Sequence, residues 1–393
     1  MSQDDICSAH RFQDPVEHVR SRLLAWYDAN KRTLPWRSLA ASKDVSPEAK
    51  GYAVWISEVM LQQTQVTTVI DYYKRWMVSW SSVDELAAGS LTEVHSLWSG
   101  LGYYSRATRL LQGAQKIVEL KEFPSSREKL LQIPGVGKYT ASAVASIAFG
   151  EPVGVVDGNV TRVLCRLRAI GKDSSSKEVI DLLWRLVDDM VDKDRSGDFN
   201  QAIMELGATI CTPKNPSCKT CPLRETCASY IQMDIEDCHL CISNYDPTKG
   251  VCNYPFKAKK AKVREESSLS LIIRTPKGRF LLFKRPSKGL LANLLEFYSP
   301  PDLSKENELA SLVGERLGGE ISGLSYIGDV FHQFSHISQT YKVWTCLIDS
   351  EEPSVPCLGD YQSSLICSSP QELHSLPIST AMKKVFKLYQ KQT

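Results

Sequence analysis

Residues 131–150 read LQIPGVGKYTASAVASIAFG, a proline–glycine turn followed by a run of small residues that predicts a helix. Gly135 and Gly137 let the backbone approach a ligand closely, and the amides that begin the helix favour an anion. Lys138 adds a positive charge beside them. A tight turn between two packed helices would also explain the glycines. The whole string is more specific, and it predicts a helix-hairpin-helix that holds a DNA phosphate without reading base sequence.

Four cysteines follow in the spacing C-x6-C-x2-C-x5-C, with prolines between them that enforce turns. They are Cys211, Cys218, Cys221 and Cys227. Such a run can bring four thiolates to one compact volume, as a [4Fe–4S] cluster requires. A structural zinc ion is the alternative, although zinc normally takes two short cysteine pairs. The spacing alone leaves both open, and the sequence upstream favours the cluster.

In this order, the hairpin, an acidic residue and the cysteine run resemble the endonuclease III superfamily of DNA glycosylases. Three strings resemble its MutY-type adenine DNA glycosylase branch more closely: SEVMLQQTQV (57–66), GLGYYSRA (100–107) and VVDGNVTRV (155–163). The resemblance runs from about Leu23 to the C-terminus, and it is weak after Cys227. It implies an enzyme that flips adenine mispaired with 8-oxoguanine, or with guanine, out of duplex DNA and removes it.

Glu58 lies in the apolar run GYAVWISEVMLQQT, residues 51–64. A carboxyl group in such surroundings loses hydration, which raises its pKa and favours the protonated form. A protonated carboxyl is the group needed to donate a proton to a purine nitrogen. An exposed helix carboxylate paired with Lys74 or Arg75 is the alternative, since most glutamates are solvated. The resemblance assigns Glu58 as the general acid.

Asp157 follows the apolar run Val153–Val156 and precedes Gly158. A carboxylate near the anomeric carbon stabilises the oxocarbenium-like transition state of N-glycosidic cleavage. Asp157 also fits the N-cap of a helix over residues 159–167, and the two roles are compatible. By resemblance, Asn159 orients this carboxylate.

The residue at position 139 distinguishes glycosylases that only remove a base from those that also cleave the DNA strand. Bifunctional relatives carry a lysine two residues after the second hairpin glycine, where its amine forms a Schiff base that leads to strand cleavage. Tyr139 occupies that position here, and tyrosine cannot form the imine. Lys138 is adjacent, but neighbours on a helix point about 100° apart, so we expect Lys138 to face phosphate rather than the pocket. The resemblance therefore implies a monofunctional glycosylase without lyase activity.

Base extrusion leaves a gap in the duplex that side chains fill. The resemblance places the wedge and stacking residues at Gln63, Thr64 and Tyr103. It places the pocket for the extruded adenine at Trp36, Arg37, Leu61 and Glu205. Ordinary core packing is the alternative for Trp36 and Leu61.

The composition fits a folded protein of two or three domains, with 393 residues, 42% hydrophobic residues and a net charge of +2. So small a positive excess means that DNA binding depends on local patches. Twelve cysteines without an apolar leader indicate a reducing compartment and metal ligation. No run of ~18 apolar residues occurs, so we expect no membrane span. Acidic residues near the N-terminus make a poor mitochondrial presequence; the predicted compartment is the nucleus, with the mitochondrion second.

Helical patterns broken by glycine and proline run from Val16 to about Tyr230, which predicts an all-α core. By resemblance the chain is multidomain: an N-terminal segment packing with the cluster module (1–30), a six-helix module with the hairpin (31–150), a [4Fe–4S] module (151–230), a linker (231–268) and an α+β Nudix-like domain (269–393). The catalytic cleft is expected between the two helical modules. A monomer is expected.

The polar, aperiodic linker holds a second cysteine set. The string CHLC (238–241) resembles the zinc-binding linker of animal members of the family, which also uses an N-terminal histidine. We predict a zinc site from His10, Cys238, Cys241 and Cys252, with Cys7 as a competing ligand. Solvated cysteines are the alternative, because one C-x2-C pair is not diagnostic. The basic string KAKKAKVR (257–264) fits a nuclear localisation signal, a DNA contact or a solvated face.

From Leu269 the pattern changes to strands, with helices expected near residues 307–317 and at the C-terminus. GLLANLLEFYSP (289–300) and HQFSH (332–336) resemble the Nudix-like domain of the same glycosylases, with Leu295 in place of the family's tryptophan. The closely spaced glutamates of the magnesium-binding Nudix signature are absent. The resemblance therefore implies a lesion reader. In it, Phe334, Ser335 and His336 probe the 8-oxoguanine strand, and Ser335 hydrogen-bonds the oxidised base.

Two other functions remain as alternatives. One is a catalytically silent lesion-binding scaffold, against which the presence of both Glu58 and Asp157 argues. The other is a nucleotide hydrolase acting through the C-terminal domain, against which the missing acidic signature argues. No clamp-binding string such as Q-x-x-L-x-x-F-F occurs near the C-terminus, so no protein partner is predicted.

Overall fold

A computed structural model describes residue 10 and residues 14–231, 238–258, 263–299, 320–334, 336–350, 364–367 and 369–392. The chain divides into two compact units. The first, called the helical unit, is Met1–Ala87 with Gln112–Lys259; the second, called the mixed unit because it combines helices with a sheet, is Ala88–Leu111 with Lys260–Thr393. The predicted domain boundaries at residues 150 and 269 do not anticipate that residues 88–111 group with the C-terminal residues. Those boundaries stay a prediction.

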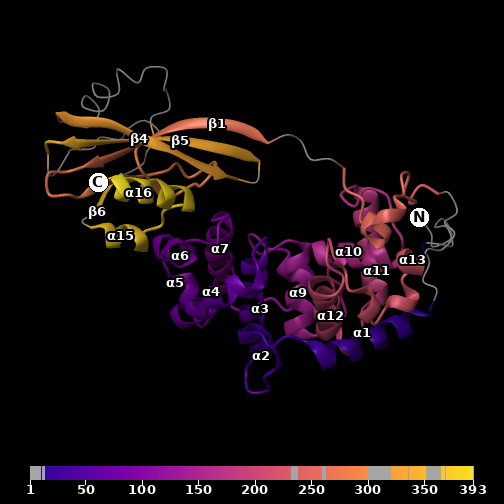
Figure 1. Cartoon of the computed structure of the whole chain (residues 1–393). Helices are drawn as coiled ribbons and strands as arrows, with labels where there is room; N and C mark the ends of the chain where they lie inside the picture. Colours follow the sequence, from indigo (N-terminus) through magenta and orange to yellow (C-terminus); the bar gives the residue numbers. More distant parts are fainter. Residues whose placement is uncertain are drawn as a thin grey trace. The chain divides into compact units, whose positions relative to one another are not determined.

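Among the described residues up to Asn253, helices account for all of the regular structure (Figure 1). They are α1 (Val16–Asn30), α2 (Pro35–Ala41), α3 (Pro47–Leu61), α4 (Val66–Ser79), α5 (Val83–Ala88), α6 (Leu91–Trp98), α7 (Ser105–Leu120), α8 (Arg127–Leu130), α9 (Lys138–Phe149), α10 (Gly158–Leu167), α11 (Lys177–Met190), α12 (Ser196–Thr209), α13 (Ala228–Ile231) and the short 3₁₀ helices η3 (Cys218–Thr220), η4 (Arg224–Thr226) and η5 (Pro247–Asn253).

Local sequence sets many of these boundaries. Ser46, Ser126 and Ser176 each accept a hydrogen bond from the amide three residues later, which caps α3, α8 and α11. Ser90 and Glu93 form a reciprocal capping box at the start of α6. Gly150 ends α9 with φ 73°, a left-handed conformation that glycine adopts without a steric penalty.

The core of the helical unit joins segments far apart in sequence. α1 packs against α11 and α12, so the N-terminal helix belongs to the same hydrophobic cluster as residues 155–206 (Figure 1). α3 packs against α9, and the residues of α3 from Gly51 to Met60 are all buried. A helix that is apolar on every side must be enclosed by others, which explains why α3 lies inside this unit.

Within the described residues, six strands form one mixed sheet: β1 (Arg264–Arg274), β2 (Phe280–Lys284), β3 (Leu295–Glu296), β4 (Ile321–Gln333), β5 (Ile337–Ile348) and β6 (Ser364–Cys367). The order is β3-β2-β1-β5-β4, with β6 paired to β2. β1 and β5 are parallel, and the other pairs are antiparallel. β4 and β5 form a hairpin in which Gln333 pairs with Ser338.

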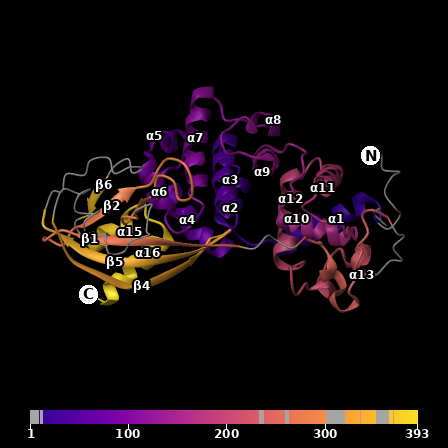
Figure 2. The same ribbon diagram turned by 90° about the horizontal axis from the view of Figure 1, so that it is seen from above.

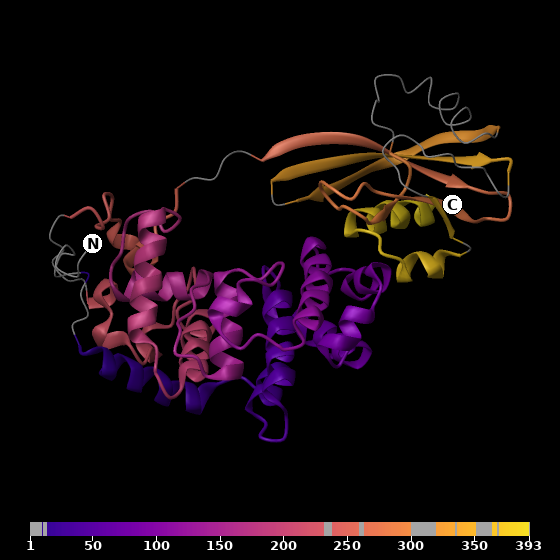
Figure 3. The same ribbon diagram turned by 180° about the vertical axis from the view of Figure 1, so that it is seen from behind.

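Alternate residues of β1 face opposite sides of the sheet, as the period of two requires. Ile272 contributes to a cluster with α15 (Pro370–Ser375) and α16 (Thr380–Gln392), whereas Leu271 and Ile273 belong to a cluster on the other face. Figures 2 and 3 show α16 lying along the sheet on the side of β4 and β5. Leu295 is buried in the α16 cluster, so it fills a packing position.

The predicted all-α core and α+β C-terminal domain are confirmed. The helix expected near residues 307–317 lies outside the described residues.

In the part of the chain that the structure describes, no helix has both the length and the apolar character needed to cross a membrane.

Candidate active site

A cavity of about 530 Å³ opens in the helical unit, walled by α3, α9, α12, the start of α10 and the segment around α2. It gathers the predicted catalytic residues, the predicted adenine pocket and two predicted DNA-contacting residues. These are Trp36, Arg37, Glu58, Leu61, Gln63, Thr64, Tyr139, Asp157, Asn159 and Glu205. Residues as far apart in sequence as Trp36 and Glu205, on separate elements, therefore line one space.

Glu58 is placed in this cavity by α3, and only 5% of its surface is exposed. The Tyr139 hydroxyl on α9 donates a hydrogen bond to Glu58 Oε2. Burial raises the pKa of Glu58 to about 7, and the hydrogen bond from Tyr139 opposes that rise. Near neutral pH the carboxyl group is thus divided between its acid and carboxylate forms, which suits proton donation.

Asp157 is the N-cap of α10 and also presents its carboxylate to the cavity. Its Oδ1 accepts from the Val160 amide at 2.7 Å, and its Oδ2 accepts from Asn159 Nδ2 at 3.0 Å. Burial raises the pKa of Asp157, and these hydrogen bonds oppose the rise. The carboxylate is therefore fixed in orientation on the cavity wall.

Glu205 on α12 is almost fully buried and is held by two arginines. Arg32 donates from Nε and Nη2 to the two carboxylate oxygens at 2.5 and 2.8 Å, and Arg37 Nη2 donates to Oε2 at 2.9 Å. Burial by itself raises the pKa of Glu205, but the two guanidinium groups hold it below its usual range. The pocket thus contains a fixed carboxylate acceptor.

Arg32 was not predicted, although it lines the cavity and binds Glu205. The one feature of the sequence that could have assigned Arg32 to the pocket is its position four residues before Trp36. Its partner lies 173 residues away, and such a pairing cannot be read from spacing.

A continuous set of hydrogen bonds leads from Asp157 towards the cysteine run. Asn159, which donates to Asp157, accepts from Arg162 Nη2 at 2.8 Å. Arg162 also donates to the carbonyls of Gly207 at 2.6 Å and Cys211 at 2.7 Å. The orientation of the cavity carboxylate is therefore connected to the backbone of the first cysteine.

The four predicted cluster cysteines surround a second, small cavity of about 30 Å³, and none of them is in a disulfide. Arg166, buried in α10, donates to Cys211 Sγ at 3.3 Å and to the carbonyls of Thr212 and Pro213 at 2.7 and 3.0 Å. A buried guanidinium directed at sulfur suits a thiolate, whose charge it offsets. The donor set therefore fits a group held by four thiolates.

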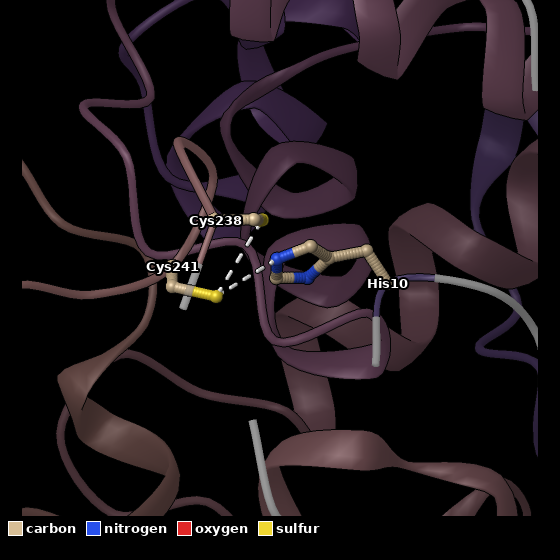
Figure 4. A group of neighbouring side chains, drawn as sticks. All are labelled: His10, Cys238 and Cys241. Atoms are coloured by element: carbon tan, nitrogen blue, oxygen red, sulfur yellow. Dashed lines mark hydrogen bonds between the residues drawn. The ribbon is translucent and has the colours of Figure 1, made fainter. Parts of the chain in front are cut away.

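His10, Cys238 and Cys241 come together as a separate group, with their ligand atoms all within 4.8 Å of one another (Figure 4). His10 Nδ1 lies 2.7 Å from the Arg168 carbonyl, so it carries the hydrogen and donates it. The Nε2 lone pair is then directed at Cys241 Sγ, 3.4 Å away, and the two sulfurs are 3.6 Å apart. This tautomer and this donor set suit zinc.

Cys252 lies elsewhere, contrary to the prediction that it completes this group. Its Sγ contacts the Lys214 carbonyl at 3.4 Å and Arg166 Nη2 at 3.9 Å, beside the loop between Cys211 and Cys218. The linker brings it there because Tyr254, two residues on, is buried in the helical core. The competing ligand Cys7 lies outside the described residues.

The predicted hairpin is formed by α8, a turn and α9. Gly135 has φ 80°, and Gly137 precedes α9 without any side-chain cap, which leaves the first amides of that helix available for an anion. Lys138 does not line the active-site cavity among the described residues; its Nζ lies 4.1 Å from the centre of the Trp184 ring. This cation–π contact fixes the charge beside the hairpin.

Two predicted wedge residues have left-handed backbones, which are uncommon for side chains other than glycine. Gln63 in the helical unit has φ 57°, and Tyr103 in the mixed unit has φ 48° with 46% of its surface exposed. Such conformations recur at functional sites.

Two of the predicted lesion-reading residues, Phe334 and His336, lie between β4 and β5. The Phe334 amide donates to the Ile337 carbonyl at 2.8 Å, and the Phe334 ring meets His332 edge-on at 4.6 Å. His336 is exposed, and Ser335 lies outside the described residues.

The family described as HhH-GPD superfamily base excision DNA repair protein matches residues 56–189, and a NUDIX domain matches residues 270–388. An adenine DNA glycosylase of Mus musculus is 45% identical, covering 99% of this chain and 81% of the mouse protein. The chain belongs to the adenine DNA glycosylase family. The family's human member is 44% identical, covering 99% of this chain and 78% of its own.

A more distant adenine DNA glycosylase, from Schizosaccharomyces pombe, is 40% identical over 84% of this chain and 81% of its own. Among solved structures, a thermostable thymine-DNA glycosylase aligns with 56% of this chain and 97% of its own, with 27% identity and a TM-score of 0.49.

Proposed function

We propose that this protein excises adenine mispaired with 8-oxoguanine, or with guanine, from duplex DNA. The observation that carries the proposal is one cavity that holds a buried acid, Glu58, a fixed carboxylate, Asp157, and a clamped acceptor, Glu205. Membership of the adenine DNA glycosylase family supports the same reaction.

The three carboxyl groups have separate tasks in this proposal. Glu205, kept ionised by Arg32 and Arg37, accepts a hydrogen bond from the exocyclic amine of the flipped adenine. Glu58 donates its proton to a purine ring nitrogen, which lets the C–N bond break with the base leaving as a neutral molecule. Asp157 stabilises the positive charge left on the sugar until water adds to the anomeric carbon, and the proton that this water releases restores the acid form of Glu58.

The reaction should stop at base removal. Tyr139, at the position of the imine-forming lysine of bifunctional relatives, is engaged with Glu58. Among the described residues that line the cavity there is no lysine. Without an amine nucleophile no Schiff base forms, so strand cleavage is not expected.

Other parts of the chain bind the DNA and recognise the base opposite adenine. The hairpin glycines and Lys138 bind a phosphate, and Gln63, Thr64 and Tyr103 fill the gap that the flipped base leaves. The β4–β5 hairpin, with Phe334, Ser335 and His336, reads the base opposite adenine.

Two metal groups accompany this function. The cysteines 211, 218, 221 and 227 would hold a [4Fe–4S] cluster, which crosslinks the loop between them. Among the described residues, no three of these four sulfurs lie as close together as the ligand atoms of His10, Cys238 and Cys241. A single zinc ion would need sulfurs about 3.8 Å apart, so the wider spacing favours the cluster. His10, Cys238 and Cys241 would hold zinc, with Cys7 as the remaining candidate for a fourth ligand. We further propose a monomer in the nucleus, in keeping with the eukaryotic relatives.

Single-turnover adenine release tests the function. Duplexes with adenine opposite 8-oxoguanine, guanine or thymine should react fast, slowly and not at all. The matched variant Glu58→Gln should bind the first duplex but release no base. If parent and variant were equally inactive in protein with the brown absorbance of an intact cluster, the scaffold alternative would replace the enzyme.

A further inference from the structure

The loop between α6 and α7 carries Tyr103 and has an unusual backbone. Gly100, Gly102 and Tyr103 have φ values of 107°, 74° and 48°, all in the left-handed region. An L residue such as Tyr103 stays in that region only when its surroundings fix it. What fixes this loop therefore decides where the Tyr103 ring is presented.

One support comes from the loop's own flanks. Arg106 is buried and donates from Nη2 to the carbonyls of Leu101 at 3.2 Å and Gly102 at 3.0 Å. Its guanidinium also lies 5.1 Å from the Trp98 ring centre and 5.6 Å from that of Tyr103. This support joins residues within the loop and on its two flanking helices.

A connection beyond these helices is supplied by Tyr104, which is buried at the end of the loop. Its hydroxyl oxygen accepts a hydrogen bond from the Gly100 amide at 3.3 Å. The same hydroxyl donates to the Ile378 carbonyl, also at 3.3 Å. His95 packs edge-on against the ring at 5.7 Å and fixes its plane. One hydroxyl group thus joins the loop backbone to the segment between α15 and α16.

A second connection starts from α16. Lys383 Nζ donates to Ser99 Oγ at 2.8 Å, at the residue that caps α6 and begins the loop. The next residue, Lys384, donates to the Phe331 carbonyl on β4 at 3.3 Å. Phe331 lies three residues before Phe334, the first residue of the predicted lesion-reading hairpin. Two adjacent lysines on one helix therefore contact the loop and the reading strand.

We propose that Tyr104 and Lys383 are positioning residues that couple the lesion-reading hairpin to the loop carrying Tyr103. When the hairpin engages the base opposite adenine, β4 and α16 hold the loop in the conformation that presents the Tyr103 ring to the duplex. Recognition of 8-oxoguanine on one strand then promotes extrusion of adenine from the other. The inference rests on the proposed function, because it assigns a route by which that recognition reaches base flipping.

The test uses the full-length protein and the variants Tyr104→Phe and Lys383→Met, each of which deletes one connection and keeps the size of the side chain. Lys387→Met, an exposed lysine of the same helix, is the matched control. Single-turnover adenine release is measured with 8-oxoguanine and with guanine opposite adenine. Base extrusion is followed separately by the fluorescence of 2-aminopurine placed at the target position.

We expect each variant to reduce the 8-oxoguanine-to-guanine rate ratio on the order of fivefold, the effect of one hydrogen bond, and to reduce extrusion with it. Lys383→Arg should restore the ratio, and Lys387→Met should leave it unchanged. An equal loss of both rates, or no change in the ratio, would overturn the inference. A parent protein that itself shows no preference for 8-oxoguanine would instead refute the proposed function, and the inference with it.

Discussion

Tyr139→Phe should move the alkaline limit of the reaction to higher pH. In the proposed mechanism the parent rate depends on protonated Glu58, whose pKa is about 7, so the rate should fall roughly tenfold per pH unit above that value. At the ordinary pKa of 4.5, only about 0.3% of the carboxyl groups would be protonated at pH 7, so burial supplies most of the active form. The Tyr139 hydroxyl stabilises the ionised carboxylate, and its removal favours the acid.

The size of the effect follows from the kind of hydrogen bond that is lost. A hydrogen bond to a charged group is worth ~1.5–3 kcal/mol, and ~1.4 kcal/mol corresponds to one pKa unit. The alkaline limb of the Tyr139→Phe profile should therefore lie about one to two pH units above that of the parent.

The assay is single-turnover adenine release across pH 5 to 9, with enzyme in excess over an adenine–8-oxoguanine duplex. Tyr52→Phe is the control, because it removes the hydroxyl of another buried tyrosine, on α3, that donates to the Trp80 carbonyl outside the cavity. A limb that stays in place or moves to lower pH in Tyr139→Phe would show that Glu58 is not the acid or that Tyr139 does not favour its ionised form.

Three further outcomes are expected. Asp157→Asn keeps an N-cap residue, so thermal stability should change little while single-turnover release falls by ~100-fold or more; an active variant would remove Asp157 from the mechanism. Arg32→Met leaves Glu205 with one guanidinium partner, and kcat/KM should drop on the order of tenfold, with a normal value contradicting the clamped acceptor. Lys138→Ala should reduce the slope of log affinity against log salt by about one, and an unchanged slope in anisotropy titrations would mean that no phosphate is held there.

Burial of Glu58 was predictable because its neighbours in sequence are also its surroundings. The apolar run around it has no polar face, so a helix there must be enclosed, and the rise of its pKa follows. Asp157 was predictable as a cap for the same reason, since both partners of its carboxylate lie within three residues. The hairpin turn is likewise local.

Contacts over long distances in sequence were not predictable. The partnership of Arg32 with Glu205 joins the segment before α2 to α12, and no periodic pattern marks it. The position of Cys252 depends on where Tyr254 is buried. Cys241 and Cys252 therefore belong to different groups of side chains, although both come from the linker. The grouping of residues 88–111 with the C-terminal residues depends on side-chain contacts such as that of Tyr104, which resembles a core tyrosine in sequence.

Few substitutions in α10 should be tolerated, because this helix contacts several groups at once. Its cap carries the cavity carboxylate, Arg162 and Arg166 are hydrogen-bonded to the cysteine run, and the carbonyl of Arg168 just beyond it fixes His10. Every position from 162 to 170 is buried, so a change chosen to suit one neighbour disturbs another. In a saturation library selected for repair in cells, tolerated substitutions between residues 160 and 170 should concentrate at Thr161, the one of these positions that is not buried.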